Sequence, residues 1–594
     1  MARMWLRHPV LWHSSRVPSG YNYTAMTPSQ IKLIRTPWHD WYTADWDYGL
    51  STIYFFCAAI AFFAIGNVLF RLRQAKGGNA NSIGEIRKIP LYTKVVALSR
   101  ALGAKQFRFP QVQYYSLPLS AVIIVLGMII YFTALTFSVH PYLWPNMAMG
   151  HSPPIATRSG WISIAVLPFL LVFATKVNFI GILAGVSHEK LQVYHRWSAW
   201  IMYITSLIHT FPFIVQSIRM GEMTTNWNTT PWYWTGVAAL VPQTWLVFMS
   251  WGPIRNRYYE TFKKLHFIAS GVFVAALFVH CNFRLTSWDY IGAAAGLYAV
   301  SWLVRVGRTF YNSFRADVAA FEALPGDAVK VVIPSKLKWG PGQHFFVRFL
   351  DLGIHAATSH PFTVATLPGE SAAKDGVSAM ELYVKVHGGI TKRLAALCQD
   401  GGLRSSRVLL DGPYGGVEGN LKVYDRVLLL AGGSGITFVV PLLLDIVRNS
   451  VKDTTQVCHK VHLVWAVRTP GALTWFEDVL STAAKQSSGN LSVNISYHIT
   501  GTSATITDEA SSMSEKSGLE QAVTKEYGRP VLRDIVREFC AEAGSVGLAA
   551  CGPQSFNFDV GNAVSECELA IARGSARCSE IYLHQESYSG LYSW

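Results

Sequence analysis

Cysteine is scarce and scattered in this chain of 594 residues, which has eight cysteines and no CxxC pair. Six of the eight follow residue 310, at irregular spacings. This pattern excludes a disulfide framework and argues against a structural zinc site. The chain also lacks an internal repeat.

Acidic residues are few as well, with 36 Asp and Glu against 51 Lys and Arg and a net charge of +15. A charge of this sign suits nucleic acid, but its distribution indicates a membrane protein. Residues 71–115 hold nine basic residues and one acid, whereas 139–160, 219–232 and 284–287 hold one basic residue each. Because positively charged loops stay inside, we expect a cytosolic C-terminal half and no nucleic-acid partner.

Apolar residues, by contrast, are abundant in the first 310 positions, in stretches long enough to cross a bilayer. We expect seven spans, at about residues 49–70, 116–138, 161–182, 196–218, 233–251, 266–283 and 288–304. An odd number of spans would place the tail formed by residues 1–47 outside. The first ten residues show no signal-peptide pattern.

Two of these spans each carry a histidine pair fourteen residues apart, His195 with His209 and His266 with His280. Fourteen residues are close to four helical turns, so the two histidines of a pair share one helix face, roughly 21 Å apart. Two such helices side by side would place facing imidazoles at two depths, an arrangement that can hold two haems. The alternative is a set of proton relays or of hydrogen bonds between helices.

After residue 310 the periodicity changes, and it predicts two further domains. Short runs at residues 329–333, 345–350, 381–386 and 408–410 predict an antiparallel β-barrel over 311–420. Strand candidates at 427–430, 461–466, 493–497 and 545–550 alternate with helical stretches, which is typical of a parallel α/β domain over 421–594. Residues 500–525 contain no apolar run, and we interpret them as a mobile insertion. The helical bundle would then occupy residues 48–310.

Two glycine-rich turns follow predicted strands of the α/β domain. Their residues are Gly432, Gly433, Gly435 and Thr437 in the first, and Cys551, Gly552 and Pro553 in the second. Glycine lets the backbone approach a pyrophosphate at a helix N-terminus, and strand ends of open α/β sheets bind ligands. An ordinary βα turn is the alternative for the first. In the barrel, a polar and aromatic segment before a strand-like run could hold a planar ring, with an ordinary turn as the alternative; its residues are His360, Pro361, Phe362 and Thr363.

In this order, the motifs resemble the ferric reductase transmembrane family, which includes fungal cell-surface metalloreductases and is related to the NADPH oxidases. The resemblance covers roughly residues 160–594. It is carried by residues 185–191 with 195–197, Tyr259-Glu260 before His266, 341–344, 360–363, 387–394, 412–415, 432–437, Trp465 with Arg468, 528–530 and 551–553. It implies a haem-binding bundle of about seven helices followed by a ferredoxin-NADP reductase-like module, namely an FAD-binding barrel and an NADPH-binding α/β domain.

The resemblance also implies roles for single residues. His195 would pair with His266 at an inner haem b, and His209 with His280 at an outer one. His387, Gly389 and Thr391 would hold the flavin pyrophosphate, and residues 360–363 the flavin. Arg468 and Arg529 would bind the NADPH phosphate. Cys551 would lie near the nicotinamide and flavin rings, with a purely structural cysteine as the alternative.

These features predict a plasma-membrane NADPH-dependent ferric-chelate reductase that passes electrons through FAD and two haems to extracellular ferric or cupric ions, upstream of a separate iron transporter. The alternative enzyme is an NADPH oxidase that reduces oxygen to superoxide. A transporter that uses the histidines as proton relays would leave the flavin and nucleotide motifs without a role.

Two features belong to the predicted outer side. Sequons at Asn22 and Asn228 would allow glycosylation there, although Asn490 and Asn494 match the same pattern in the cytosolic half. One loop contains His140, Met147, Met149 and His151, which are ligand types suited to copper(I) and iron. An ordinary loop is the simpler interpretation of that group.

Overall fold

The computed structural model describes residues 22–587, apart from 37, 40–44, 77–89, 113, 151, 283–285, 317, 354–355, 357, 370–375, 400–404, 453–456, 487–490 and 502–522. The chain divides into two compact units. We call them the helical unit, which runs to Asn67 and over Ile123–Val304, and the sheet unit, which comprises Val68–Val122 and Arg305–Leu591.

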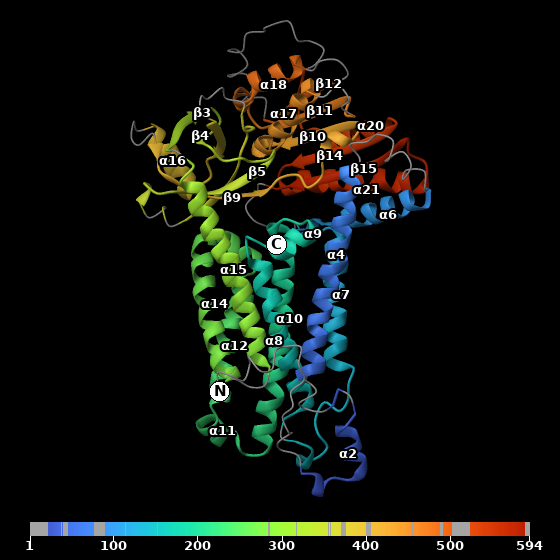
Figure 1. Ribbon diagram of the computed structural model, residues 1–594, viewed down its shortest axis with the longest axis vertical. Coiled ribbons are helices and arrows are strands. Elements are labelled where there is room, and N and C mark those ends of the chain that lie inside the picture. Colours follow the sequence, from blue (N-terminus) through green and yellow to red (C-terminus); the bar gives the residue numbers. More distant parts are fainter. Residues whose placement is uncertain are drawn as a thin grey trace. The chain divides into compact units, whose positions relative to one another are not determined.

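The helical unit is built from long apolar helices (Figure 1). The long helices are α4 (Leu50–Lys76), α7 (Leu119–Phe137), α8 (Pro154–Ala174), α10 (His188–Arg219), α12 (Pro231–Met249), α14 (Tyr259–Cys281) and α15 (Ser287–Ser313). Shorter helices are η1 (Tyr23–Ala25), α2 (Pro28–Ile34), η2 (Asp45–Gly49), η4 (Met147–Met149), α9 (Phe179–Ala184), α11 (Met223–Thr229) and α13 (Gly252–Arg257). One end of each of α4, α7 and α15 belongs to the sheet unit.

Within the described residues, seven helices are long and apolar enough to cross a membrane by length and composition. Six of them are α4, α7, α8, α10, α14 and α15, and the seventh, Gly433–Val451, belongs to the sheet unit. The fifth predicted span forms α12, which has the length of α7 but is rich in tryptophan and tyrosine. Each of the seven predicted spans therefore overlaps a helix.

The third predicted span is misplaced. Residues 161–182 were expected, whereas α8 ends at Ala174 and a separate helix, α9, begins at Phe179. Asn178 causes the break, because its amide donates to Val172 O (2.7 Å) and its side-chain oxygen accepts from Gly181 N (2.9 Å). An asparagine that caps a new helix in this way ends the apolar run as a single span.

Helix α8 is the centre of the helical unit, with buried residues on almost every turn. It packs along α10, while α12 packs along α14. Ser163 of α8 and Ser206 of α10 hydrogen-bond through their hydroxyls at 2.8 Å, which satisfies both groups inside the bundle. Small and hydroxylated residues of this kind allow close approach between helices in lipid.

The sheet unit contains an antiparallel part formed by two small sheets around one core. Its elements are β3 (Ala319–Leu324), β4 (Ala328–Ser335), β5 (Gln343–Phe349), β6 (His360–Thr363), β7 (Ser378–Lys385), α16 (Gly389–Gln399), β8 (Ser405–Ser406) and β9 (Val408–Gly415). The strand orders are β7-β4-β3-β8 and β6-β5-β9. Alternate residues of β4 and β7 face the core, where Val331, Phe345 and Leu382 are buried. The predicted antiparallel architecture is confirmed.

One strand of this part is shifted from its expected place. Residues 360–363 were expected to precede a strand, but they form β6 themselves, and Val364 makes only an isolated bridge to Leu382. Because β6 lies at the edge of its sheet, Pro361 needs no N–H for a ladder hydrogen bond.

The remainder of the sheet unit is a six-stranded parallel sheet in the order β13-β12-β11-β10-β14-β15. Its strands are β10 (Arg426–Gly432), β11 (Lys460–Val467), β12 (Ser492–Ile499), β13 (Val523–Tyr527), β14 (Gly544–Cys551) and β15 (Cys578–Glu586). Its helices are η6 (Leu421–Val423), η7 (Gly433–Gly435), α17 (Ile436–Lys452), η8 (Pro470–Trp475), α18 (Glu477–Lys485), α20 (Leu532–Ala541) and α21 (Gln554–Arg573). The predicted parallel sheet is confirmed.

Helices cover both faces of this sheet. Val427 and Leu429 of β10 pack in the core that contains α17 and α18, and Leu428 and Leu430 pack in the core that contains α20 and α21. A strand buried on both faces reads as a continuous apolar run, as β10 does. The strand order reverses between β10 and β14, where open sheets of this kind bind ligands.

The predicted insertion over residues 500–525 is too long at its C-terminal end. Val523–Lys525 belong to β13, while residues 502–522 lie outside the described part of the chain. Strand β13 is at the sheet edge and most of its side chains are exposed. Such a strand carries no apolar alternation, so the sequence does not reveal it.

A buried ion cluster joins the end of α15 to β9. The carboxylate of Asp411 accepts hydrogen bonds from Arg305 Nε (2.7 Å), Arg308 Nη2 (3.2 Å) and the Tyr414 hydroxyl (2.6 Å). The amide of Asn312 donates to Gly412 O at 2.7 Å. Because leaving a buried charge without its partners is costly, this cluster holds the helix end on the strand.

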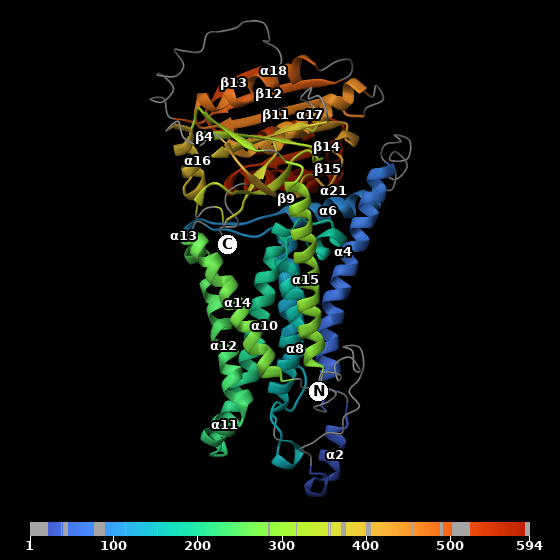
Figure 2. The same ribbon diagram turned by 60° about the vertical axis from the view of Figure 1, so that its left-hand side comes forward.

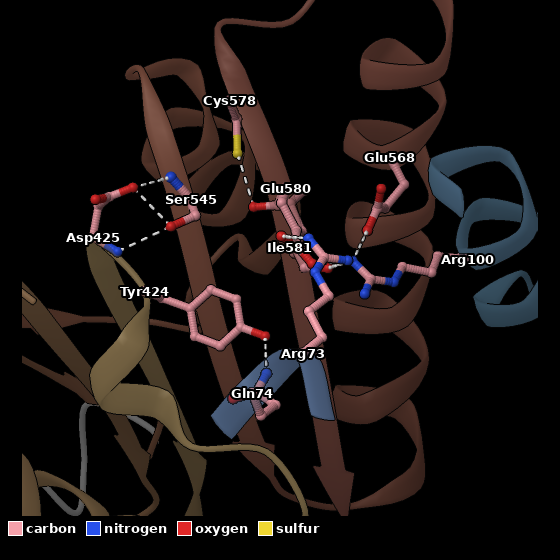
Figure 3. A network of polar contacts seen from close by, with 10 residues as sticks. All are labelled: Arg73, Gln74, Arg100, Tyr424, Asp425, Ser545, Glu568, Cys578, Glu580 and Ile581. Carbon is pink, nitrogen blue, oxygen red and sulfur yellow. Dashed lines mark hydrogen bonds and ion pairs between the residues drawn. The ribbon is translucent and has the colours of Figure 1, made fainter. Parts of the chain in front are cut away.

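A second polar network joins the end of α4 and the helix α6 (Pro90–Ala104) to β15 and α21 (Figure 3). Arg73 donates to Glu580 at 2.6 Å, and Arg100 donates to Glu580 (3.1 Å) and to Ile581 O (2.8 Å). The carboxylate of Glu568 lies 3.8 Å from Arg100. Burial raises the pKa of Glu568 to about 8, although Arg100 opposes this shift.

We expect Asp411→Ala to lower the free energy of unfolding of the sheet unit by about 2–3 kcal/mol, since two half-buried guanidinium groups lose their carboxylate. The midpoint of thermal unfolding in detergent should fall by about 5–10 °C. Arg407→Ala is the control, because it removes the exposed ion pair with Asp351 and should leave the midpoint near that of the parent. Equal effects of the two substitutions would contradict the assignment.

Glu568→Gln should change how stability depends on pH. The folded-state pKa of about 8 lies above the ordinary 4.5, so folding favours the protonated acid, and its stabilisation is lost as the pH rises through the folded value. Between about pH 5 and 8 the midpoint of the parent should therefore fall more steeply than that of the glutamine variant. Glu566→Gln on the exposed side of α21 is the matched control, and it should not flatten the profile.

Candidate functional site

The four histidines of the predicted pairs face each other across the helical unit. The ring centroids of His195 and His266 are 6.4 Å apart, and those of His209 and His280 are 6.2 Å apart. The two rings of each pair come from α10 and α14. Helix α10 packs mainly on α8, and α14 packs mainly on α12. The bundle therefore holds two imidazole pairs across a gap between these helices, one pair four turns from the other.

Hydrogen bonds set the orientation of the α10 histidines. His195 Nδ1 donates to Leu170 O at 2.9 Å, and His209 Nδ1 donates to Ala156 O at 2.7 Å. Both acceptors are main-chain carbonyls of α8. An imidazole whose Nδ1 donates to a carbonyl presents Nε2 as a lone-pair donor, which is the usual state of a metal-bound histidine.

Two glycines make room for the rings of the second pair. A Cβ atom at Gly160 would lie 2.5 Å from His209 Nδ1, and one at Gly236 would lie 3.0 Å from His280 Cε1. The hydroxyl of Thr235 lies 3.4 Å from His280 Nδ1. Sequence reasoning missed these residues, because glycine is common in membrane helices and gives no distinguishing pattern.

The pair geometry suits a haem iron with two axial imidazoles. Two bonds from a metal to nitrogen of about 2 Å each, together with the ring radii, bring the ring centres of two axial imidazoles to about 6 Å. Within the described residues no cluster of three or more His, Cys, Asp or Glu could hold a metal. A metal bound by either pair must bring its other ligands with it, as a porphyrin does. His266 Nδ1 is buried without a hydrogen-bond partner among the described residues, so its ring is positioned by packing alone.

The two glycine-rich turns of the sheet unit touch each other at the point where the strand order reverses. A Cβ atom at Gly435 would lie 2.1 Å from Cys551 O, and one at Gly432 would lie 3.0 Å from Pro553 Cδ. Gly433 has a φ of +56°, which favours glycine, and its carbonyl accepts a hydrogen bond from Trp465 Nε1 at 3.0 Å. Glycine is thus required here by close approach and by backbone conformation.

Cys551 ends β14 beside Glu586, the last residue of β15, which is its partner in the sheet register. Burial, with the nearby Glu586 carboxylate, raises the pKa of the Cys551 thiol well above its usual range. The thiol therefore stays protonated and is not an activated nucleophile. His584 of the same strand lies 3.0 Å from Glu586 and stacks on Phe438 of α17.

Phe438 also connects the antiparallel and parallel parts of the sheet unit. A Cβ atom at Gly342, in the loop before β5, would lie 2.7 Å from this ring. The contacts thus lead from Gly342 through Phe438 and His584 to Glu586 and Cys551. Phe438, His584 and Glu586 were not predicted as site residues, because nothing in their spacing separates them from ordinary core and surface positions.

Arg468 and Arg529 lie at one edge of the parallel sheet. Arg468 follows the last residue of β11 and Arg529 follows the end of β13 by two residues. Both side chains are exposed, and neither forms an ion pair within the described residues. Because parallel strands end at the same edge of a sheet, both residues follow strands on the side where the glycine-rich turns lie.

Two further predicted segments lie in the antiparallel part. In β6, Pro361 is exposed, and Phe362 and Thr363 are partly buried, while His360 Nε2 contacts the Thr358 hydroxyl at 3.2 Å. At the start of α16 the Thr391 hydroxyl accepts from His387 N (3.0 Å) and Gly388 N (3.2 Å), and Gly389 has a φ of +53°. The helix thus begins at an exposed, capped turn.

Of the four loop residues whose types suit copper(I) and iron, the structure describes the side chains of His140 and Met149. Met149 is fully buried with Met26 and Ile34, and His140 O accepts from His39 Nε2 at 2.6 Å. His151 lies outside the described residues. The packing of Met149 supports the simpler interpretation of an ordinary loop.

The fold and these contacts define a class: a membrane-spanning helical bundle joined to a two-part module with an antiparallel FAD-type domain and a parallel nucleotide domain. Three family models match the chain. Residues 159–277 match the ferric reductase like transmembrane component, 313–418 the FAD-binding domain and 424–565 the ferric reductase NAD binding domain.

The chain belongs to the ferric reductase transmembrane family. It is 32% identical over 480 residues to the probable cell surface ferric reductase kap2 of Aspergillus oryzae, covering 76% of this chain and 59% of that protein. It is 29% identical over 408 residues to ferric/cupric reductase transmembrane component 7 of Saccharomyces cerevisiae (strain S288c), covering 66% of this chain and 62% of that protein. The chain thus spans about three fifths of these two relatives. Against component 7 of strain YJM789 the identity is 26%, over 84% of this chain and 85% of that protein.

Gly435→Ala tests the nucleotide turn. The added methyl group would meet Cys551 O at 2.1 Å, so the two turns must separate. We expect the Kd for NADPH, measured by quenching of protein fluorescence, to rise at least about tenfold, equivalent to about 1.4 kcal/mol. Gly561→Ala is the control, because a Cβ atom there meets only ordinary contacts at 3.5 Å and beyond. An unchanged Kd in the first variant would remove these turns from the nucleotide site.

Proposed function

We propose that this protein is an NADPH-dependent ferric-chelate reductase that moves electrons across a membrane. The observation that carries the proposal is the combination, in one chain, of two facing histidine pairs inside an apolar bundle with FAD-binding and NAD-binding domains. The names of the related ferric and cupric reductases support metal ions as acceptors. Neither the helices nor the domains alone would suggest this reaction.

The residues fit the cofactors that this function needs. When bound, FAD would supply the link between two-electron and one-electron chemistry, and haem b would supply one-electron transfer. His195 and His266 would hold one haem, and His209 and His280 would hold the other. Their Nδ1 hydrogen bonds to α8 hold the α10 imidazoles in the ligating tautomer.

The sheet unit would bind and orient the dinucleotides. Gly432, Gly433 and Gly435 let the pyrophosphate of NADPH approach the start of α17, with Gly552 and Pro553 beside them. Arg468 and Arg529 would bind the phosphate groups. Cys551, whose raised pKa keeps the thiol protonated, would lie beside the nicotinamide as a neutral group. Residues 360–363 would contact the flavin and residues 387–391 its pyrophosphate.

The distribution of basic residues supports a cytosolic sheet unit, and the name of the related cell surface ferric reductase supports the plasma membrane as its location. The acceptor would then be reduced outside, where a separate iron transporter would take up the product. Asn22 and Asn228 would be glycosylated on that side, and Asn228 is exposed on α11. Asn494 lies within the central strand β12, a position unsuited to glycosylation.

With two protein ligands on each iron, neither pair leaves a position open for the acceptor, so electrons would leave by an outer-sphere route. The same arrangement can deliver electrons to oxygen, which keeps an NADPH oxidase as the alternative enzyme. The two functions are separated by experiment. Reduction of a ferric chelate by membranes that persists without oxygen and is insensitive to superoxide dismutase supports the reductase. Reduction that requires oxygen and is abolished by the dismutase supports the oxidase.

We expect His209→Ala to remove one of two haems and to lower ferric-chelate reduction more than about tenfold, since an axial ligand is lost. Haem content per protein, measured as the pyridine haemochrome, should fall by half, while NADPH-dependent reduction of the flavin continues. His459→Ala, at an exposed position in the sheet unit, is the control. Full haem content in His209→Ala would exclude this histidine as a ligand.

A further inference from the structure

Helix α6 presents two different apolar faces. One face packs on α21, where Ala97 and Ala101 are buried and the Ser565 hydroxyl donates to Ala101 O at 2.7 Å (Figures 1 and 2). The ion pairs of Arg100 with Glu580 and Glu568 lie on the same side (Figure 3). The helix is therefore fixed on the nucleotide domain in one rotational setting, and its other face is presented in a defined direction.

The other face is an exposed apolar stripe, formed by residues at helical spacing. Its members are Leu91 (72% exposed), Val95 (57%), Leu98 (43%) and Leu102 (48%). Further exposed apolar residues follow in the chain, Phe107, Phe109 and Val112, in and beside the hairpin of β1 (Arg108–Phe109), η3 (Pro110–Val112) and β2 (Tyr114–Tyr115). Contiguous apolar surface of this kind marks an interaction site with a protein or a membrane.

Hydrogen bonds place the end of α6 at the entry of a membrane span. Leu119 N, in the first turn of α7, donates to Lys105 O at 2.9 Å, and the Ser120 hydroxyl donates to Gly103 O at 3.0 Å. Helix α7 is one of those apolar enough to cross the bilayer. A helix whose last turn is bonded to the first turn of a span must lie close to the membrane surface.

The charge of this segment is of one sign. Residues 90–118 contain Lys94, Arg100, Lys105 and Arg108 and no acidic residue. Lys94 is exposed on α6 within one turn of Leu91 and Leu98, and Arg108 is exposed in the hairpin. A helix with leucine and aromatic residues on one face and cations at its border is typical of segments that lie in the headgroup region and attract anionic lipids.

We propose that α6 and its hairpin form an interfacial anchor: the stripe from Leu91 to Leu102 lies in the boundary between headgroups and acyl chains, and the adjacent cations bind anionic phospholipid headgroups. The anchor fixes the nucleotide domain to the membrane surface through the α6–α21 contact. The proposal needs only that α7 crosses the membrane, and it stands whether the protein is a reductase or an oxidase.

The test is photo-crosslinking of the full-length protein in nanodiscs that contain phosphatidylcholine and phosphatidylserine. A benzophenone amino acid replaces Leu98 or, as the control, Val531, which is 61% exposed on the same domain outside α6. We expect adducts with phospholipid at position 98 and none at position 531. A crosslinked dimer at position 98 would show that a second copy covers the stripe, and the absence of lipid adducts would show that it faces water; either result overturns the proposal.

The headgroup preference is tested in the same discs. When the benzophenone amino acid is at position 98 of the otherwise unchanged protein, the share of phosphatidylserine among the lipid adducts should be at least about twofold higher than its share of the disc lipids. The double substitution Lys94→Glu with Arg108→Glu should abolish that enrichment while lipid adducts persist. Retained flavin absorbance shows that the variants are folded. Enrichment that survives the charge reversal would overturn the role of the cations.

Discussion

Two main-chain hydrogen bonds, from His195 to Leu170 O and from His209 to Ala156 O, set the tautomer and direction of the imidazoles on which the proposed electron path depends. The buried Nδ1 atoms of His195 and His209 find their acceptors in main-chain carbonyls of the neighbouring helix α8. Helix α8 is therefore a positioning element, although it contributes no ligand. This positioning role agrees with the burial of α8 and with its close packing on α10.

Outside the bundle, carboxylates hold the helix ends. Asp411 binds an arginine of the last turns of α15, and Glu580 binds one arginine at the end of α4 and one in α6. Both acids are largely buried and both are bound by two arginines, so each contact is specific in direction as well as favourable. The arginines lie at the positions where positively charged loops are expected to leave the membrane. The basic residues that predict orientation in the membrane thus also form ion pairs within the sheet unit.

The sequence was sufficient for features that depend on strong, local patterns. Long apolar runs predicted the seven helices, and short β-branched runs predicted β4, β5, β10 and β11. Edge strands were harder to predict from the sequence, because β13 is exposed and because every third residue of β15, rather than every second, is buried. Histidine spacing predicted which rings face each other, whereas the roles of Gly160 and Gly236 depend on contacts between helices that no single sequence displays. The two faces of α6 also become distinguishable only once α21 covers one of them.

Helix α17 has a consequence for biosynthesis. Residues Gly433–Val451 have a mean hydropathy of 1.3, slightly above the 1.2 of α15, which does continue the membrane bundle. When this segment leaves the ribosome, only β10 of its sheet has been made, since β11, β12 and β14 follow in the chain. The insertion machinery thus meets another apolar helix of spanning length after the spans of the helical unit and the antiparallel part have been made. Correct topology requires that this helix stay out of the bilayer until the later strands cover it. Completion of the parallel sheet therefore competes with insertion of α17 into the membrane.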